Sequence, residues 1–306
     1  MPGVSSGWWV SFVRSFYDGA SMSLLSGTDN LAIVRLDNIG VTYADGNVAL
    51  QSVSLQLNRG EFAVVLGASG AGKSTLLRTI NTLTPLSQGD VWVGGLGDGT
   101  DKGLHPLIDA NAVRSHRQQT GMIFQQHQLI ERQSALQNVL MGRLGHYSFW
   151  RSLLPLSQPD QELALDCLRR VGLIDKALTP VKNLSGGQQQ RVGIARALAQ
   201  QPRLMLADEP IASLDPASAH GVLSLLRNIC KTDGIAALLS LHQVEFAMAY
   251  GDRIIGLAQG RVVFDAPPAQ VSDRDLEQIY NPASGQQPVV RPAESPAHPM
   301  NSDYRI

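Results

Sequence analysis

A glycine-rich run in the first third of the chain offers the clearest chemistry. It follows a short apolar segment, Glu61–Leu66, and precedes a helix expected over Lys73–Thr82. Glycines let successive backbone N–H groups face one anion at a helix N-terminus, where the peptide dipoles favour negative charge. Lys73 would add an ammonium for nucleotide phosphates, and the Ser74 hydroxyl could ligate Mg²⁺. The predicted phosphate loop consists of Gly67, Ala68, Ser69, Gly70, Ala71, Gly72, Lys73, Ser74 and Thr75.

Two adjacent carboxylates follow a second apolar run, Arg203–Ala207. Ligands of parallel sheets bind at the carboxyl ends of the strands. At such an edge Asp208 could hold Mg²⁺, while Glu209 could orient and deprotonate an attacking water. Alone, an Asp-Glu pair after a strand is more often a solvated loop. The prediction of a catalytic role therefore depends on the phosphate loop being present as well.

Strand-like and helix-like segments alternate along the chain, which predicts an α/β fold with a largely parallel sheet. We expect a helix over Pro216–Lys231, and then a third buried strand, opened by Gly234, over Ile235–Leu241. Arg253–Phe264 is predicted to form two strands joined by a turn at Gln259-Gly260. Residues of about 126–190 are rich in Gln and Leu and lack strand-like runs, so a helical subdomain is expected there.

The two ends of the chain differ from the middle in composition. Residues 1–29 are predicted to be a poorly ordered N-terminal extension, and translation from Met22 is one reading of it; the other is an aromatic anchor for a membrane surface or a partner. Residues 282–306 are predicted to be a Pro-rich disordered tail. The aromatic residues of the extension are Trp8, Trp9, Phe12, Phe16 and Tyr17.

Composition excludes several classes of protein. The 306 residues include 25 basic and 26 acidic side chains, so no general basic field for nucleic acid is expected. The longest apolar stretches, such as Ile235 to Leu239, fall well short of the roughly 20 residues of a membrane-spanning helix. The N-terminus lacks the pattern of a signal peptide. Cys167 and Cys230 have no metal or redox spacing, and both are predicted to be core thiols.

The string Leu184-Ser-Gly-Gly-Gln188, followed by Gln-Gln-Arg191, is the point at which this sequence resembles ATP-binding cassette (ABC) ATPases. The other elements of that family occur in the expected order over residues 31–265. The resemblance implies roles for residues that would be weak signals by themselves. Tyr43 would stack on adenine, Gln125 would link the nucleotide site to the helical subdomain, Ser213-Leu-Asp215 would cross a dimer interface, and His242 would contact the γ-phosphate.

The resemblance also implies a fold and a ligand set. The fold is a P-loop NTPase over residues 30–281, with a RecA-like core, an antiparallel β subdomain and an inserted helical subdomain. The ligands are ATP and Mg²⁺. The implied catalytic residues are Glu209, His242, Gln125 and Lys73, and the implied metal ligands are Ser74, Gln125 and Asp208. The nucleotide contacts beyond the phosphate loop are Tyr43, Ser185, Gly187, Gln188 and Asp215.

A phosphate loop leaves one side of the γ-phosphate open. Ser185 and Gly187, at the start of another helix, offer hydroxyl and N–H donors suited to that side. The resemblance implies that a second copy of the chain supplies these donors, head to tail, so that a homodimer sandwiches two ATP molecules. Hydrolysis would then require the dimer.

A single cassette without a membrane span implies separate membrane subunits, docked around residues 126–160. A closer resemblance is to the ATP-binding subunits of phosphonate importers, with Gly142–Leu154 the most distinctive part; this part could instead be an insertion that packs on itself. The implied protein lies peripherally at the cytoplasmic face of the bacterial inner membrane, with two permease subunits and an extracytoplasmic solute-binding protein. The segments that carry the resemblance are Ile123–Leu129, Asn138–Leu144, Trp150–Leu154, Asp208–Ser218, Ser240–Val244 and Ile254–Gly256.

Other functions stay open at this point. An importer of phosphite or another oxyanion could use a nearly identical ATPase, because selectivity belongs to the binding protein and the pore. A cytosolic cassette protein acting on ribosomes or DNA is disfavoured by the single cassette and the lack of heptads. A module that binds ATP without hydrolysing it is disfavoured by the presence of Glu209.

Overall fold

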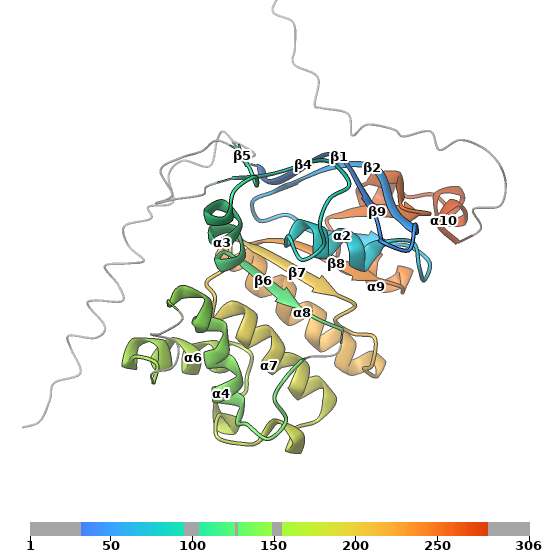
Figure 1. Ribbon diagram of the computed structural model, residues 1–306. Coiled ribbons are helices and arrows are strands. Elements are labelled where there is room, and N and C mark those ends of the chain that lie inside the picture. Colours follow the sequence, from blue (N-terminus) through green and yellow to red (C-terminus); the bar gives the residue numbers. More distant parts are fainter. Residues whose placement is uncertain (1–31, 95–103, 126–127, 149–154, 281–306) are drawn as a thin grey trace, which may run out of the picture. The chain divides into compact units, whose positions relative to one another are not determined.

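The computed structural model describes residues 32–94, 104–125, 128–148 and 155–280 (Figure 1). Both predicted tails and the segment Trp150–Leu154 lie outside these residues. The described strands form two sheets. The antiparallel sheet has the order β2 (Val48–Asn58), β1 (Ala32–Thr42), β4 (Gln88–Gly94), β5 (Leu104–Pro106). The second sheet has the order β10 (Arg261–Ala266), β9 (Arg253–Ala258), β3 (Phe62–Leu66), β8 (Ala236–Leu241), β7 (Leu204–Asp208), β6 (Thr120–Ile123).

The second sheet is parallel from β9 to β6, with β10 added antiparallel at one edge. Its strands β3, β7 and β8 are buried along their whole length and almost entirely apolar, as expected for strands covered on both faces. In β3, Val64 and Leu66 face one core while Ala63 and Val65 face the other, as the two-residue period of a strand requires. The predicted α/β fold with a largely parallel sheet and a separate antiparallel sheet is confirmed.

Helix α2 (Lys73–Ile80) lies between the two sheets (Figure 1). Leu76, Leu77 and Ile80 are fully buried there, so the N-terminus of the helix is fixed at the carboxyl end of β3. The helix ends two residues earlier than the sequence predicted. The N–H of Asn81 still bonds to Leu77, but Thr82 has a left-handed backbone, with φ of 56°, which helix geometry does not allow.

The opposite face of the parallel sheet is covered by helices (Figure 1). Gly234 ends α8 in a left-handed conformation, with φ of 66°, so it caps the helix and does not open the strand, which begins at Ala236. The described residues between 128 and 190 contain helices and loops, in line with the helical prediction, and α7 continues to Leu198. The boundaries 126–190 stay a prediction. These helices are α4 (Ala135–Leu140), η1 (Met141–His146), α6 (Gln158–Arg170), η2 (Ile174–Lys176), η3 (Val181–Asn183), α7 (Gly186–Leu198), α8 (Pro216–Asp233), α9 (Val244–Tyr250), η4 (Pro268–Gln270) and α10 (Asp273–Tyr280).

The two cysteines are free and buried, as predicted. Cys167 lies on α6 and Cys230 on α8. Burial raises the pKa of the Cys167 thiol to about 11 and that of Cys230 to about 12, so both are protonated, inert core residues. No helix in the described part of the chain is both long and apolar enough to cross a membrane.

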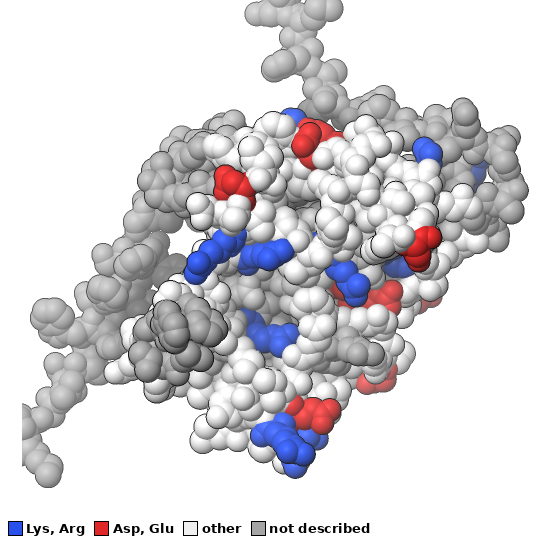
Figure 2. Space-filling model, viewed as in Figure 1, with Lys and Arg blue, Asp and Glu red and all other residues white. Residues whose placement is uncertain are grey.

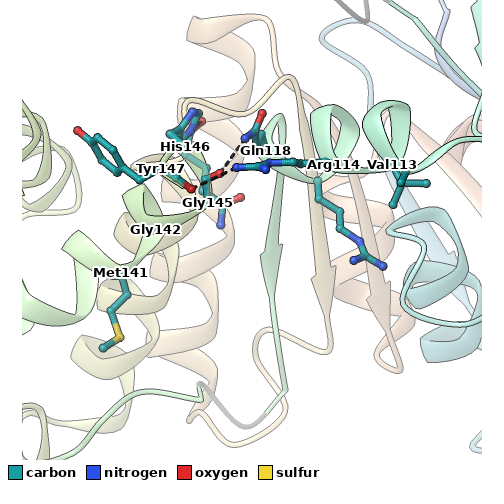
Figure 3. A pocket seen from close by; sticks show the side chains of 11 residues that line it. Val113, Arg114, Gln118, Met141, Gly142, Gly145, His146 and Tyr147 are labelled. Carbon is teal, nitrogen blue, oxygen red and sulfur yellow. Dashed lines mark hydrogen bonds between the residues drawn. The ribbon is translucent and has the colours of Figure 1, made fainter. Parts of the chain in front are cut away.

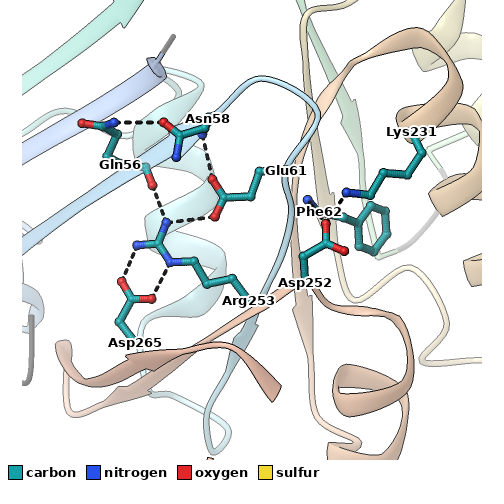
Figure 4. Close-up of polar contacts among 8 residues, drawn as sticks. All are labelled: Gln56, Asn58, Glu61, Phe62, Lys231, Asp252, Arg253 and Asp265. Atoms are coloured by element: carbon teal, nitrogen blue, oxygen red, sulfur yellow. Dashed lines mark hydrogen bonds and ion pairs between the residues drawn. The ribbon is translucent and has the colours of Figure 1, made fainter. Parts of the chain in front are cut away.

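A polar cluster joins the two sheets where β3 and β9 begin (Figure 4). The phosphate loop follows the other end of β3. Arg253 pairs with Asp265 of β10 and with Glu61 at 3.0 Å, and it donates to the Gln56 carbonyl of β2 at 2.7 Å. Burial lowers the pKa of Arg253, but its hydrogen bonds with these carboxylates outweigh that effect and raise it. Asp252 accepts from the Phe62 N–H at 2.9 Å. These bonds fix the relative position of the strands that carry the candidate site.

Candidate active site

The predicted phosphate loop connects β3 directly to α2, and close contacts require two of its glycines, Gly67 and Gly72. A Cβ at Gly67 would lie 2.5 Å from the Leu257 carbonyl oxygen, and one at Gly72 would lie 2.5 Å from that of Ala49. Gly72 also has φ of 104°, which side chains of L residues rarely allow. The loop is therefore held tightly against β9 and β2, with its N–H groups at the start of α2.

Lys73 is 4% exposed and lies over this loop. Its ammonium donates to the carbonyls of Gly67 at 2.8 Å and Ala68 at 3.1 Å. Burial lowers the pKa of Lys73, and the nearby carboxylates of Glu209 and Asp208 oppose that shift. A cation is thus placed at the mouth of the loop, where an anion would gain most from it.

Asp208, at the end of β7, is buried between two hydroxyls. Ser74 and Ser240 each donate to its Oδ1 at 2.8 Å, and Ser240 Oγ also accepts from the Glu209 N–H at 2.9 Å. β7 and β8 are neighbours, and Asp208 pairs with Ser240 in the ladder. Ser240 was missed by the sequence analysis. Its signal was a lone hydroxyl near the end of an otherwise apolar strand.

Glu209 lies next to His242 and Gln125. Its Oε1 is 2.5 Å from His242 Nε2, and its Oε2 accepts from Gln125 Nε2 at 2.9 Å. His242 Nδ1 lies 3.3 Å from Lys73 Nζ; because an ammonium can only donate, Nδ1 accepts and Nε2 carries the proton toward Glu209. The four predicted catalytic residues therefore form one connected group.

The backbone of Glu209 is left-handed, with φ of 49°. Such a conformation costs a non-glycine residue of order 1 kcal/mol and persists where surrounding contacts enforce it. Here the N–H of Glu209 is held by Ser240 and its carboxylate by His242 and Gln125. The strain aims the carboxylate across the ends of β8 and β3, toward the phosphate loop.

Tyr43 lies in the turn that joins β1 to β2, where its N–H donates to the Asn47 carbonyl at 2.9 Å. Its hydroxyl is 3.0 Å from Thr75 Oγ1, at the end of the phosphate loop. The side chain is 38% exposed. An exposed ring beside the loop is suited to stacking on a planar base.

Ser185, Gly187, Gln188 and Asp215 are not part of this group. Ser185 caps α7 and forms a capping box with Gln188, a pattern that its Ser-x-x-Gln spacing already signalled but that the sequence analysis missed. Asp215 caps α8 by accepting from the Ser218 N–H at 3.0 Å. Within the described residues no hydrogen bond joins these four residues to the phosphate loop. A Cβ at Gly187 would lie 3.6 Å from Ser218, so the two helix starts contact each other.

A cavity of about 580 Å³ lies apart from the catalytic group, between α3 (Ala110–Gln118), η1 and the end of α7 (Figure 3). Arg114 donates to the Tyr147 carbonyl at 3.2 Å, and Gln118 donates to that of Gly145 at 2.7 Å. Lys and Arg side chains gather on this face in the region of α3 (Figure 2). The cavity is lined by Ala110, Val113, Arg114, Arg117, Gln118, Met141, Gly142, Gly145, His146, Tyr147 and Gln200.

The wall of this cavity that η1 forms is held in place by contacts of η1 with α6 and with the residue after α7. Arg143 pairs with the buried Asp160 at 2.9 Å and donates to the Ala199 carbonyl at 2.9 Å. Burial would raise the pKa of Asp160, but its hydrogen bonds with Ser157, Tyr147 and Arg143 lower it to about 2. The described part of the segment Gly142–Leu154 is thus anchored to α6 and to the residue that follows α7, and it forms one wall of the cavity.

Comparison with known proteins gives one consistent result. Residues 50–212 match the family model described as ABC transporter. The chain is 59% identical over 252 residues to the phosphonates import ATP-binding protein PhnC 1 of Trichodesmium erythraeum, which covers 82% of this chain and 97% of that protein. It is 56% identical over 267 residues to the phosphite import ATP-binding protein PxtA of Stutzerimonas stutzeri, covering 87% and 93%.

A solved structure agrees with the fold. The dimeric ATP-binding cassette MJ0796, in a post-hydrolysis state bound to ADP and Pi, aligns with a TM-score of 0.64 and 33% identity. The alignment covers 77% of this chain and 99% of that structure. The similarity therefore spans nearly the whole of that cassette and about three quarters of this chain.

Proposed function

Because this chain belongs to the ABC transporter family, as an ATP-hydrolysing cassette, we propose that it drives import of a phosphorus oxyanion, a phosphonate or phosphite, through separate membrane subunits. The observation that carries the choice of solute is similarity at 59% and 56% identity to a phosphonate and a phosphite import subunit, over nearly their whole length. The catalytic residues described above contact nucleotide in this proposal and leave solute selection to other subunits.

The solute proposal is tested by growth of a host that depends on this chain. Deleting its gene should abolish growth on methylphosphonate or on phosphite as the sole phosphorus source, while growth on inorganic phosphate is retained. Restoring the gene should restore growth. Loss on only one of the two compounds would identify the solute, and normal growth and uptake on both would contradict the proposal.

The geometry supports distinct roles for the residues of the catalytic group. The loop N–H groups and Lys73 bind the β- and γ-phosphates, and Tyr43 stacks on the base. Glu209 takes a proton from the attacking water. His242 holds the first Glu209 carboxylate oxygen through its Nε2 proton, and Gln125 holds the second. A contact of His242 with the γ-phosphate requires that this proton turn from Glu209 to the phosphate when nucleotide binds. The order β3, β8, β7 places His242 between the loop and Glu209.

The Ser74 hydroxyl and the Asp208 carboxylate fit a Mg²⁺ ion. Both are hard oxygen donors, they lie 2.8 Å apart, and Asp208 is aligned by Ser240. Mg²⁺ in nucleotide sites is held by one or two such side chains together with phosphates and waters, and it neutralises phosphate charge. The amide nitrogen of Gln125 donates a hydrogen bond to Glu209, so the amide oxygen remains available to the ion.

A second copy of the chain is proposed to complete each site. The Ser185 oxygen accepts from the Gln188 N–H, so its own O–H proton is still available to donate. The N–H groups of Gly186 and Gly187 are in the first turn of α7, where they have no partner within the helix. These donors suit a phosphate but are not joined to the phosphate loop of their own chain. A head-to-tail homodimer, with Asp215 and Gln188 at the interface, would bring them to it.

Replacing Ser185 by Ala should reduce ATP hydrolysis at least about tenfold, because a donor to the transition-state phosphate is lost. ATP binding to the monomer should be unchanged, since the ligand of Ser185 lies on the other chain. Hydrolysis is measured by phosphate release, and binding is measured by equilibrium titration at concentrations that keep the chain monomeric.

Ser134 provides the matched control. It caps α4 with a capping box to Gln137, as Ser185 caps α7 with Gln188. Either Ser→Ala change should cost about 1 kcal/mol of unfolding free energy. Only the change at Ser185 should also reduce hydrolysis. Weakened monomer binding in the Ser185 variant would contradict the dimer proposal.

The cavity between α3 and η1 is the proposed docking surface for a membrane subunit. It presents Arg114 and Arg117 beside apolar and backbone groups, and arginine is enriched at protein interfaces. The wall of the cavity formed by η1 is held in place by the ion pair of Arg143 with Asp160. A rigid groove that couples α3 of the nucleotide-binding core to the helical subdomain can transmit movement between the two.

Arg114→Glu should reduce the amount of membrane subunit that copurifies with this chain about tenfold, as expected for loss of an interface arginine. Arg169→Glu on α6 is the control, since Arg169 is exposed and, among the described residues, its side chain pairs with Asp166 alone. It should copurify like the unaltered chain. Equal recovery with the Arg114 variant would place the docking surface elsewhere.

The proposal that the chain belongs to an importer also implies its cellular location and its other partners. We place the chain peripherally at the cytoplasmic face of the inner membrane, with two permease subunits and an extracytoplasmic solute-binding protein. The cytosolic alternative makes the opposite prediction for the same experiment. Under it, no membrane subunit would copurify with the unaltered chain.

A further inference from the structure

We propose that Tyr280, the last residue of α10, is a positioning residue for His242. Its hydroxyl donates to the backbone carbonyl of His242 at 3.0 Å. This inference rests on the role proposed above for His242, because Tyr280 acts through that residue. It assigns the C-terminal helix a part in hydrolysis that the sequence motifs do not suggest.

The backbone of His242 lies beyond the part of β8 that the sheet holds. The pairing of β8 with β3 ends at Leu241, and its pairing with β7 ends at Ser240. The next helix, α9, begins at Val244, and its N-cap Gln243 makes no capping bond with its side chain. His242 therefore lies in a two-residue link between β8 and α9, where one additional hydrogen bond can change its position.

Helix α10 is itself firmly attached. Ile279 is 1% exposed and belongs to the main core, and the helix packs on β9 and β10. At its start, Ser272 and Asp275 exchange hydrogen bonds between backbone and side chain. Tyr280 follows the buried Ile279 directly, so its hydroxyl is a fixed point from which to hold a carbonyl.

The chemistry of the two groups determines which of them donates this hydrogen bond. A carbonyl only accepts, so the phenol must donate, which it can do only when protonated. Partial burial raises the pKa of Tyr280 above its ordinary value, so the donor is intact throughout the neutral range. The titratable groups that meet His242 itself are Glu209 and Lys73, at the ring nitrogens.

Fixing the His242 carbonyl limits the position of its imidazole. The ring must reach Glu209 on one side and Lys73 on the other, at 2.5 and 3.3 Å. Catalysis is sensitive to small displacements of positioned groups. Loss of the hydrogen bond from Tyr280 should therefore affect the rate of hydrolysis more than the binding of ATP.

The test is Tyr280→Phe in the full chain, which removes the hydroxyl and keeps the ring. The expected result is a kcat for ATP hydrolysis lowered roughly three- to tenfold, the effect of one lost hydrogen bond, with KM for ATP within about twofold. Amide exchange should become faster at residues 242–244 but not within α10. A merely structural role would instead speed exchange in α10 and lower thermal stability.

Tyr250→Phe is the matched control. Tyr250 also donates its hydroxyl to a backbone carbonyl, that of His220, at 3.2 Å, away from the catalytic group. Its kcat should be unchanged. Unaltered kcat and exchange in Tyr280→Phe would overturn the inference, as would equal losses of kcat in the two variants.

His242→Ala separates this inference from the role on which it rests. If His242→Ala abolishes hydrolysis while Tyr280→Phe behaves like the unaltered chain, the role of His242 stands and that of Tyr280 fails. If His242→Ala retains normal kcat, the role of His242 itself fails. Support requires a large loss in His242→Ala, a smaller one in Tyr280→Phe and none in Tyr250→Phe.

Discussion

Glu209→Gln should slow ATP turnover by at least about 100-fold while ATP still binds, because general base catalysis contributes about 10²–10⁴ in rate. An amide of the same size cannot accept the proton of the attacking water. The phosphate loop, Lys73 and the Ser74–Asp208 pair are unchanged, so the groups that bind nucleotide remain. The variant should consequently accumulate as an ATP-bound dimer, detectable by its size in the presence of ATP and Mg²⁺.

The control for this variant is Glu162→Gln on α6. Glu162 is exposed and accepts from Gln158 one turn away, far from the phosphate loop in the chain. Its turnover and its monomeric size should match those of the unaltered chain. Turnover near normal in Glu209→Gln would mean that another group takes the proton. Low turnover without an ATP-bound dimer would point to lost binding.

Lys73→Ala should abolish measurable turnover and weaken ATP binding about 10- to 100-fold. Hydrogen bonds from a charged group contribute about 1.5–3 kcal/mol each, and the ammonium is the buried cation of the loop. Removing it also takes away the donor to the Gly67 and Ala68 carbonyls and the contact with His242. Binding is measured by equilibrium titration with ATP, and turnover by phosphate release.

Lys176→Ala separates loss of a particular lysine from loss of any positive charge. The Lys176 side chain is 45% exposed and, within the described part of the chain, forms its one ion pair with the neighbouring Asp175, at 3.6 Å. Both variants lower the net charge by one, but only the change at Lys73 should affect ATP. If Lys73→Ala bound ATP normally, the loop N–H groups alone would be sufficient for binding, and the role of Lys73 would be limited to the rate.

Local features were predictable because each is encoded within a short run of consecutive residues. A buried strand, a glycine turn and a helix start follow one another between Phe62 and Ile80, and each requirement is met by neighbouring residues. Errors arose at the ends of elements. The left-handed Thr82 at the end of α2 has no glycine to signal it. Gly234 does carry a signal that was overlooked, because a glycine that follows a helix commonly ends it.

Contacts between residues far apart in the chain were harder to predict from the sequence. Ser240 lies in a segment that was recognised only through its neighbour His242, and Tyr280 lies in a stretch without a motif, yet they hold Asp208 and His242. Ser185 and Gln188 were recognised through a family motif, while their capping box has a plain local signal that was overlooked. Motifs identify groups that meet the ligand, but they say little about the groups that hold those residues in place.

The sequence by itself determined the family, the phosphate loop and the acidic strand end, because covalent neighbours impose these features directly. Only the tertiary structure decided how they meet. Lys73, Glu209 and His242 are brought together by the strand order β3, β8, β7, and strand order is set by packing across the whole sheet. The same packing keeps Ser185 and Gly187 apart from the phosphate loop of their own chain. Side-chain chemistry is local in sequence, whereas the geometry of a site is a property of the assembled core.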